Sequence, residues 1–333
     1  MDKVAAGGNR SEKPAAIRHR AGQRISAALL VIMSLSAQAL DLQGHRGARG
    51  LLPENTLPAF SRALDLGMTT LELDCGVTRD GVVVVAHDRT LNPDITRDAQ
   101  GKWLDGAPPA IRKLTYVELV RYDVGRLKPG TEYAKRFPKQ QPMDGTRVPA
   151  LSDLFELVRS RGDAKVRFNI ETKLSPLAPD ETVAPDAFVR ALLGAIRKAG
   201  VESRVTIQSF DWRTLKIVQK EAPGIPTVYL TAESTSPHNV PRDATPSPWT
   251  AGHQLSAHGG SLPRMVKAAG GAVWSPYHGE LTPGRLREAH ALGLKVVVWT
   301  VNSKADMRRL IEWRVGGIIS DYPDVLAKVA RLR

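Results

Sequence analysis

The sequence predicts an α/β protein, a TIM (β/α)8 barrel with an antiparallel hairpin after its second strand and inserted loops over the barrel mouth. Short apolar, β-rich runs alternate with amphipathic helical segments along most of the chain, and eight of these runs can be parallel strands. Polar residues gather where these runs end, which is the face on which such barrels carry their chemistry. A chain of 333 residues is long enough for one domain of this size with additional segments.

The composition excludes several classes of protein. The single cysteine, Cys75, cannot form an intramolecular disulfide, and we expect it to pack as a small apolar residue. The formal net charge is +13, and it is +9 without the first 39 residues, where six Lys/Arg exceed two Asp/Glu by four. We find no nucleic-acid-binding motif. The charge fits an anionic substrate, or is simply that of a basic protein.

Residues 1–39 have the features of an export signal, and residues 40–333 then form the barrel domain. Three arginines precede the apolar run 25–35, which is too short to span a bilayer as a helix. An A-x-A site ends at Ala39, so we expect cleavage there and a mature chain that begins at Leu40. We therefore expect a periplasmic or secreted protein with no stable membrane insertion after cleavage. An uncleaved membrane anchor is the alternative.

The first elements of the barrel have recognisable boundaries. Asn55 or Thr56 can cap the first helix, and Gly67 can end it. We expect a strand over 41–46, a glycine-rich loop over 47–54, a helix over 57–66 and a second strand over 70–74.

Residues 77–87 predict a hairpin. Arg79-Asp80-Gly81 is a tight-turn signal between two β-rich runs, and no room remains for a crossover helix. The strand that leads to His87 must therefore run antiparallel to the second strand, and it is not one of the eight barrel strands.

Two irregular stretches predict inserts. Residues 89–149 are polar with weak periodicity, and they form either a lid that selects the alcohol part of a substrate or a mobile loop. Within them we expect a short helix over 114–120, because Thr115 and Glu118 match a capping box. The second insert is the proline-rich stretch 233–259.

From residue 149 onward the alternation is regular. Ser152 can cap the next helix, and Gly200 can close the long one that follows. We expect strands over 164–173, 204–210, 227–231, 272–277, 295–301 and 317–320, and helices over 154–161, 186–199, 211–221, 262–269, 283–292, 304–313 and from Pro323.

Three carboxylates predict a metal site. Glu72 and Asp74 are two residues apart on a strand, so their side chains point to the same side. Two such acids repel each other unless a cation lies between them, and carboxylate oxygens are preferred ligands of Mg²⁺ and Ca²⁺. Glu171 ends the third strand in the same setting. A solvated strand end is the alternative for an isolated E-x-D.

The order of motifs resembles the glycerophosphodiester phosphodiesterase family, in its exported bacterial form, from about residue 44 to the end. The motifs are H-R-G at 45–47, P-E-N-T at 53–56, E-x-D at 72–74, V-V-x-x-H-D at 83–88, I-E-x-K at 170–173, W-T-V-N at 299–302 and G-I-I-S-D-Y-P at 317–323. The resemblance implies a TIM barrel, one divalent cation, two catalytic histidines and a small glycerophosphodiester substrate, with glycerol 3-phosphate and an alcohol as products.

The chemistry of a phosphodiester and the places of polar residues at strand ends give expected roles for individual residues, and the resemblance adds the route of the reaction. His45 is assigned as acid and His87 as base, with the reverse left open, and the glycerol 2-hydroxyl attacks phosphorus to give a cyclic phosphate that water opens. We expect one Ca²⁺ or Mg²⁺ to be held by Glu72, Asp74 and Glu171. Arg46 and Lys173 either add positive charge at the phosphate or pair with the acids, and Glu54 binds metal or substrate or orients Arg46. Phe210 and Trp299 either pack in the upper barrel or contact glycerol carbons. We expect the other histidines, His19, His238, His253, His258, His278 and His290, to be structural.

Two other functions remain open at this point. A sphingomyelinase-type phospholipase D has a similar barrel, two histidines and carboxylate-bound Mg²⁺, although P-E-N-T and I-E-x-K argue against it. A non-catalytic exported binder of anionic glycerophosphodiesters also fits the charge, but it does not need both histidines and three acids. The head group of the substrate and the oligomeric state are not predicted.

Overall fold

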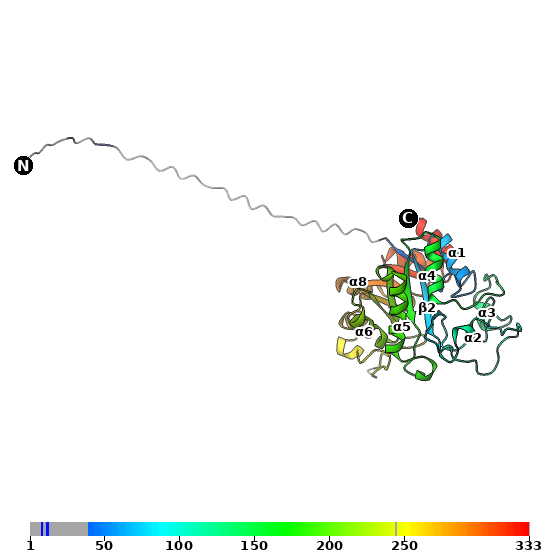
Figure 1. Ribbon diagram of the computed structural model, residues 1–333. Helices are drawn as coiled ribbons and strands as arrows, with labels where there is room; N and C mark the ends of the chain where they lie inside the picture. The colour runs from blue at the N-terminus through cyan, green and yellow to red at the C-terminus, as the bar shows by residue number, and fades with distance from the viewer. Residues whose placement is uncertain (1–7, 9–10, 13–38, 244, 333) are drawn as a thin grey trace, which may run out of the picture. The chain divides into compact units, whose positions relative to one another are not determined.

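Eight parallel strands form a closed barrel. The computed structural model describes residues 8, 11–12, 39–243 and 245–332, and within 39–332 the eight strands close because β1 pairs with both β2 and β9. The strands are β1 Asp41–Gly44, β2 Thr70–Val77, β4 Arg167–Thr172, β5 Val205–Ser209, β6 Thr227–Thr231, β7 Val273–Pro276, β8 Lys295–Val298 and β9 Gly317–Ser320. This arrangement confirms the predicted fold (Figure 1).

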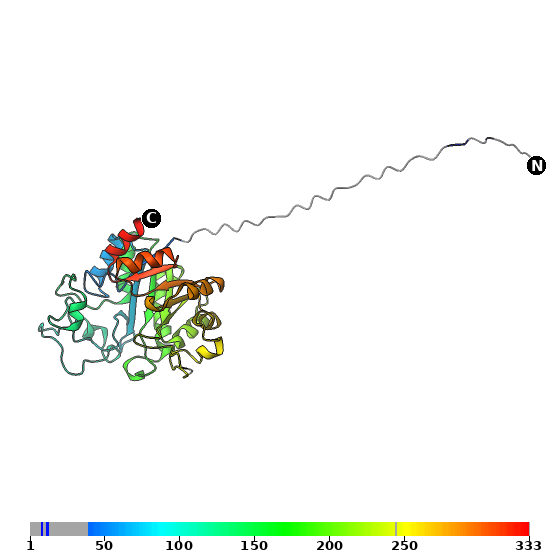
Figure 2. The same cartoon turned by 180° about the vertical axis from the view of Figure 1, so that it is seen from behind.

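Helices surround the strands, and Figure 2 shows the same domain from behind. Short polar side chains cap several of them: Thr56 accepts from the Ala59 N–H, and Ser261 from the Arg264 N–H. Gly200, with φ of 66°, ends the longest of the helices that surround the described barrel. The helices are α1 Leu57–Asp65, α4 Leu151–Ser160, α5 Pro185–Ala199, α6 Trp212–Glu221, α7 Leu262–Ala268, α8 Pro283–Ala291, α9 Lys304–Glu312 and α10 Pro323–Arg331.

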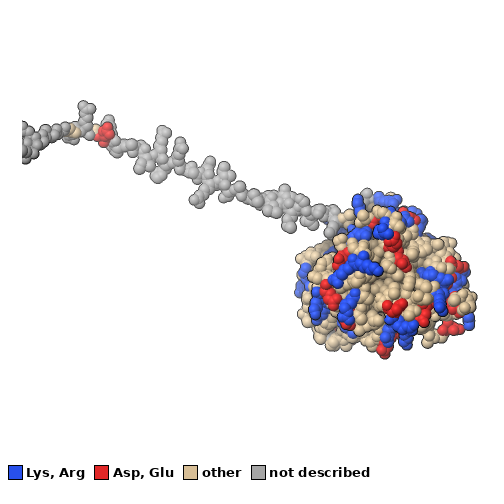
Figure 3. All heavy atoms as spheres, viewed as in Figure 1, with Lys and Arg blue, Asp and Glu red and all other residues tan. Residues whose placement is uncertain are grey.

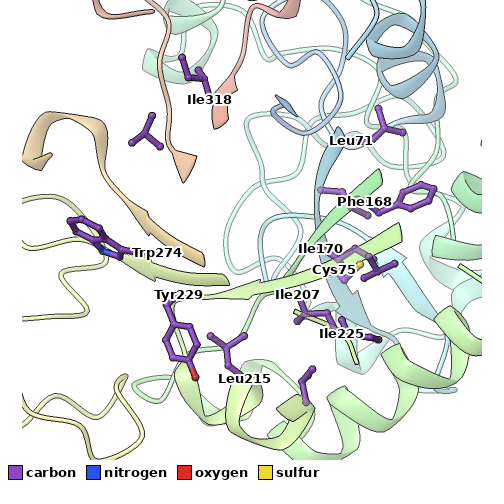
Figure 4. Packing of buried hydrophobic residues seen from close by; sticks show 14 of the residues in the cluster. Leu71, Cys75, Phe168, Ile170, Ile207, Leu215, Ile225, Tyr229, Trp274 and Ile318 are labelled. Carbon is purple, nitrogen blue, oxygen red and sulfur yellow. The ribbon is translucent and has the colours of Figure 1, made fainter. Parts of the chain in front are cut away.

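The strands use their two faces differently. Outward-facing side chains such as Leu71, Cys75 and Phe168 are fully buried against the helices (Figure 4). The inward face of one half of the barrel is apolar, and it is formed by Val228, Val273, Val297 and Ile319. The other half, on β1, β2, β4 and β5, carries buried polar side chains: Gln43, Thr70, Glu72, Asp74, Asn169, Glu171 and Gln208. The alternation along β2 therefore separates the packing core from the polar interior.

The predicted hairpin is present. β3 Val83–Val85 pairs antiparallel with β2, and the turn is closed where the Thr78 N–H donates to the Val82 carbonyl. His87 follows two residues after β3, so the returning arm carries it back toward the barrel.

The insert over 89–149 is a folded subdomain with its own apolar cluster. It contains a 3₁₀ turn, η1 Ile111–Lys113, and two short helices, α2 Tyr116–Leu119 and α3 Glu132–Arg136. The apolar cluster is formed by Val84, Leu91, Ile111, Leu119, Val124 and Val148. Thr115 caps α2 with the predicted capping box to Glu118.

The second insert is fixed by one asparagine. Asn239, which is fully buried, accepts from the Ala232 N–H and donates to the Leu230 carbonyl, so it ties the insert to the end of β6. Four further 3₁₀ turns occur in the described chain, namely η2 Pro179–Glu181, η3 Glu202–Arg204, η4 Leu255–His258 and η5 His278–Glu280.

Some predicted boundaries are wrong. α4 begins at Leu151, so Ser152 is not its cap; instead Asp153 accepts from the Ala150 N–H. Several strands are shorter than predicted, so His45, Phe210 and Trp299 lie just beyond their ends, and Trp299 still forms an isolated parallel bridge with Tyr277. The predicted export signal lies almost entirely outside the described residues. Among the described helices, none combines the length and apolar character needed to cross a membrane.

Candidate active site

The three predicted metal ligands meet at the barrel mouth. Glu72 and Asp74 project from β2 into the interior, and the strand register places Asp74 opposite Glu171 of β4. One carboxylate oxygen from each residue lies within 4.8 Å of the other two, and all three residues are buried. The shared direction follows from the i, i+2 spacing on β2, whereas the proximity of Glu171 requires the pairing of β2 with β4.

The protonation of these acids reflects their crowding. Burial, followed by the charge of Asp74, raises the pKa of Glu72 well above its usual range. Burial also raises the pKa of Glu171 to about 7, with Asp74 adding to the shift and Lys173 opposing it. Although burial alone would raise it, the pKa of Asp74 is lowered by the neighbouring cations, Arg46 first. Crowded, acceptor-only oxygens of this kind fit a hard divalent cation.

A strained turn after β1 brings Arg46 to the acids. Arg46 has a φ of 49°, and its backbone N–H donates to Oε2 of Glu72 at 2.9 Å. Its guanidinium lies 2.6 Å from Oε1 of Glu54 and 3.2 Å from Oδ2 of Asp74. Gly47, with a φ of 80°, completes the turn, and a Cβ there would lie 2.7 Å from the backbone of Ala59. Close packing against α1 therefore explains the glycine in H-R-G.

The first histidine is held by a carboxylate from the opposite end of the chain. Nδ1 of His45 lies 2.6 Å from Oδ1 of Asp321, and its Nε2 lies 3.9 Å from Oε2 of Glu72. Asp321 also accepts from Arg49 and from Asn302. Burial, together with the charge of Arg49, lowers the pKa of His45 to about 4.

The second histidine has a similar arrangement. Nδ1 of His87 lies 2.9 Å from Oδ1 of Asp88, whose other oxygen accepts from Asn92. Burial and the charges of Arg46 and Lys173 lower the pKa of His87. Since an ionised carboxylate only accepts, both rings carry their proton on Nδ1 and leave Nε2 unprotonated.

Both histidines and two of the three acids line one cleft of about 680 Å³, together with Lys173 and a wall of aromatic side chains. Nζ of Lys173 lies 2.7 Å from Oε1 of Glu171 and 3.7 Å from Oδ1 of Asp74. Phe210 and Trp299 form an edge-to-face pair with centroids 5.3 Å apart, and both line the cleft. Lysine, carboxylates and imidazoles therefore face the same space.

The insert over 89–149 also reaches this cleft. The hydroxyl of Tyr133 donates to Glu54, and Arg136 lies over the Tyr133 ring and lines the cleft. The guanidinium of Arg49 lies 4.6 Å from the Phe137 ring centroid, which anchors α3 to the barrel. Residues of the insert therefore form one wall of the cleft.

Sequence reasoning missed several residues of this site. Asp321 was recognisable only within the G-I-I-S-D-Y-P motif and Gln208 only as a polar strand end; Asn55 was expected only as a possible helix cap within P-E-N-T, and Arg49 and Tyr133 were not singled out. Asn55 donates to Oδ2 of Asp74 at 3.0 Å. The residues expected to be structural behave differently from the site residues: in the described part of the chain, His238, His253, His258, His278 and His290 do not line the cleft, and His19 lies outside the described residues.

The surface charge is mixed on the face drawn in Figure 3. Figure 3 shows Lys and Arg side chains interspersed with Asp and Glu on the face in view, rather than gathered into one basic stripe.

Comparison with known proteins agrees with this geometry. Residues 45–325 match the model of the glycerophosphoryl diester phosphodiesterase family. A glycerophosphodiester phosphodiesterase of Caldanaerobacter subterraneus is 31% identical over 287 residues, which are 86% of this chain and 96% of the relative. A crystal structure from Silicibacter pomeroyi, assigned to the same family, has a TM-score of 0.78 and 38% identity and covers 88% of this chain and 94% of its own. An Oleispira antarctica phosphodiesterase, solved with sn-glycerol-3-phosphate, is 19% identical with a TM-score of 0.65, covers 88% and 97% of the two chains, and shows a similar fold.

Proposed function

The chain belongs to the glycerophosphoryl diester phosphodiesterase family, a family of phosphoric diester hydrolases, and from this premise we propose that it hydrolyses glycerophosphodiesters to sn-glycerol 3-phosphate and an alcohol. One observation carries the proposal: three buried carboxylates meet beside two imidazoles, each of which has Nδ1 on a carboxylate. A protein that only binds its ligand has no need of two oriented bases beside a metal-type acidic cluster.

Glu72, Asp74 and Glu171 would hold one divalent cation, either Ca²⁺ or Mg²⁺. When bound, such an ion supplies Lewis-acid stabilisation of negative charge on a phosphoryl oxygen. The fit rests on the crowding of the three acids, since a cation lowers the cost of keeping them ionised.

The imidazoles carry the protons. His45 and His87 each keep Nδ1 on a carboxylate, which leaves Nε2 for proton transfer: the ring that acts as base takes the proton of the attacking hydroxyl at Nε2, and the ring that acts as acid must first gain a proton at Nε2, which it then delivers to the leaving alcohol. We retain His45 as the acid and His87 as the base, with the glycerol 2-hydroxyl as the first nucleophile. The first step gives a cyclic phosphate. In the second step water is the nucleophile that opens this cyclic phosphate, and the two histidines exchange their roles as acid and base.

Other side chains bind the substrate. Lys173 supplies positive charge for the phosphate, because its contacts with Glu171 and Asp74 keep it protonated and at the cleft. Arg46 also contributes positive charge toward the phosphate; its guanidinium lies between Glu54 and Asp74, and Glu54 orients it. The ring faces of Phe210 and Trp299 offer apolar contact to glycerol carbons.

A panel assay tests the proposal. The purified protein, stripped of metal and then supplied with Ca²⁺ or Mg²⁺, is offered glycerophosphodiesters with choline, ethanolamine, glycerol and inositol head groups. We expect metal-dependent release of glycerol 3-phosphate. Release of choline from sphingomyelin alone would indicate a phospholipase D, and binding without turnover of any substrate would indicate a binder.

We also propose that the protein is exported and acts in the periplasm or outside the cell. The support is the basic, apolar and A-x-A sequence of residues 1–39. N-terminal sequencing of the exported protein should find Leu40 first, and an intact Met1 terminus would contradict cleavage.

A further inference from the structure

A chain of buried side-chain amides crosses the polar half of the barrel. Nε2 of Gln208 donates to Oε1 of Glu72 at 2.6 Å, although the two residues lie on β5 and β2. Oε1 of Gln208 accepts from Nδ2 of Asn169 at 2.9 Å, and the same nitrogen donates to Oε1 of Gln43 at 3.0 Å. Nε2 of Gln43 donates to Oδ2 of Asp41 at 3.2 Å, close to the opposite end of the barrel.

The carboxylates at the two ends decide how these amides point. The lowered pKa of Asp41 keeps it ionised, and Glu72 is ionised when it ligates a cation; since an ionised carboxylate only accepts hydrogen bonds, Gln43 and Gln208 must each turn their NH₂ group toward it. Both then present a carbonyl oxygen to Asn169, whose NH₂ group has two hydrogens to give. Oδ1 of Asn169 accepts from the Thr206 hydroxyl at 2.8 Å. Reversing one amide would break its hydrogen bonds at both ends, so the chain has one stable direction.

Burial makes it costly to reverse the orientation of any of these side-chain amides. Gln43, Asn169, Gln208 and Glu72 are each at most 3% exposed, so water cannot replace a lost partner. The other oxygen of Glu72 accepts from the Arg46 N–H, so both oxygens of this carboxylate are held. The contact from Arg46 comes from the backbone, whereas the contact from Gln208 comes from a side chain and can be removed by substitution.

We propose that Gln208 is a positioning residue of the metal site: its N–H holds Glu72 in the orientation that a divalent cation needs, and the amide chain keeps that N–H turned toward Glu72. The inference rests on the proposed metal-dependent function. Removing a hydrogen-bond partner of a metal-ligating side chain typically weakens metal binding by about 10- to 100-fold.

Gln208→Met removes the donor and nearly conserves the volume. We expect isothermal titration with Ca²⁺, and separately with Mg²⁺, to give a Kd about 10- to 100-fold above wild type. Gln219→Met is the matched control: this amide also has several hydrogen-bond partners within reach of its NH₂ group, namely Thr227, Tyr229 and the Ala269 carbonyl, but it lies on α6, outside the barrel interior.

The outcomes separate cleanly. A folded Gln208→Met protein with wild-type cation affinity would refute the positioning role, as would an equal loss in Gln219→Met. Should Gln208→Met not fold, Gln43→Met tests the same chain from one step further away. A smaller rise in Kd is expected there, and an unchanged Kd would then count against the proposal. A wild-type protein that binds neither cation would refute the proposed metal-dependent function itself.

Discussion

Nδ1 of His45 lies 2.6 Å from Oδ1 of Asp321, although 276 residues separate them in the chain. Asp321 is 2% exposed, and Arg49 and Asn302 also donate to it. Although burial alone would raise it, the pKa of Asp321 is lowered by Arg49 and His45, so this carboxylate stays ionised. It therefore fixes the tautomer and the ring orientation of His45, and closure of the barrel by β1 and β9 is what brings the two together.

Asp321→Asn should reduce kcat/KM by roughly 10²- to 10⁴-fold, the range for losing a positioned acid or base. The amide nitrogen cannot accept from Nδ1 of His45, and the imidazole loses its fixed tautomer. NMR titration of His45 checks this role, because Asp321 raises the pKa of His45 and its removal should lower that pKa further. A fall in activity with no change in the His45 titration would point to a merely structural role.

The two histidines can be assigned with an activated substrate. The p-nitrophenyl ester of glycerol 3-phosphate has a leaving group that needs no proton, so loss of the acid matters little for it. His45→Ala should lose roughly 10²- to 10⁴-fold on glycerophosphocholine but much less on this ester, whereas His87→Ala should lose activity on both. The reverse pattern would make His87 the acid. Near-wild-type turnover of glycerophosphocholine by either variant would remove that histidine from the mechanism.

Glu171→Gln should separate metal binding from folding. In metal-free protein at pH 8 its melting temperature should rise: because the folded-state pKa of Glu171 is raised from 4.5 to about 7, its ionisation costs the folded state stability progressively between these two pH values, and the whole cost is present at pH 8. Added Ca²⁺ or Mg²⁺ stabilises wild type by about 2.7 kcal/mol at 100 times Kd, and a much smaller thermal shift is expected for the variant.

Activity of Glu171→Gln should fall by at least about 10- to 100-fold, the range for losing a mere partner of a metal ligand, at a cation concentration that saturates wild type. Glu132→Gln, which removes an exposed carboxylate paired with Lys135, is the control and should behave as wild type. An undiminished thermal shift in Glu171→Gln would show that Glu171 does not ligate the metal.

Asp41→Asn tests a stabilising cluster at the other end of the barrel. Although burial opposes the shift, Lys295 at 2.9 Å, Thr70 and Arg167 lower the pKa of Asp41 from 3.8 to about 2. The folded state therefore binds this proton less tightly than the unfolded state. The resulting stability is complete above about pH 4 and is lost as pH falls through 2.

Denaturant unfolding should give a loss of about 2 kcal/mol for Asp41→Asn at pH 7, with the difference from wild type shrinking toward pH 2. Asp65→Asn, which breaks an exposed pair with Arg161, is the control and should lose less than about 1 kcal/mol at any pH. A pH-independent loss in Asp41→Asn would mean that packing, rather than charge, explains the effect.

Much of the fold could be predicted because its signals are local. Strand and helix periodicity, a turn at Asp80-Gly81 and caps at Thr56 and Thr115 each depend on a few neighbouring residues, and the structure confirms them. The boundary of α4 was wrong because two cap signals lie close together, and the Asp153 side chain, rather than Ser152, satisfies the free backbone N–H.

By itself, the sequence determined the candidate residues for the chemistry: the spacing of Glu72 and Asp74 sets their shared direction on any strand. Only the tertiary structure decided which side chains these residues contact. Asp321 meets His45 because the barrel closes, Tyr133 meets Glu54 because the insert folds back, and Gln208 reaches Glu72 across two strand registers. Periodicity is a property of consecutive dihedral angles, whereas these contacts join residues 79 or more positions apart and depend on strand register and closure.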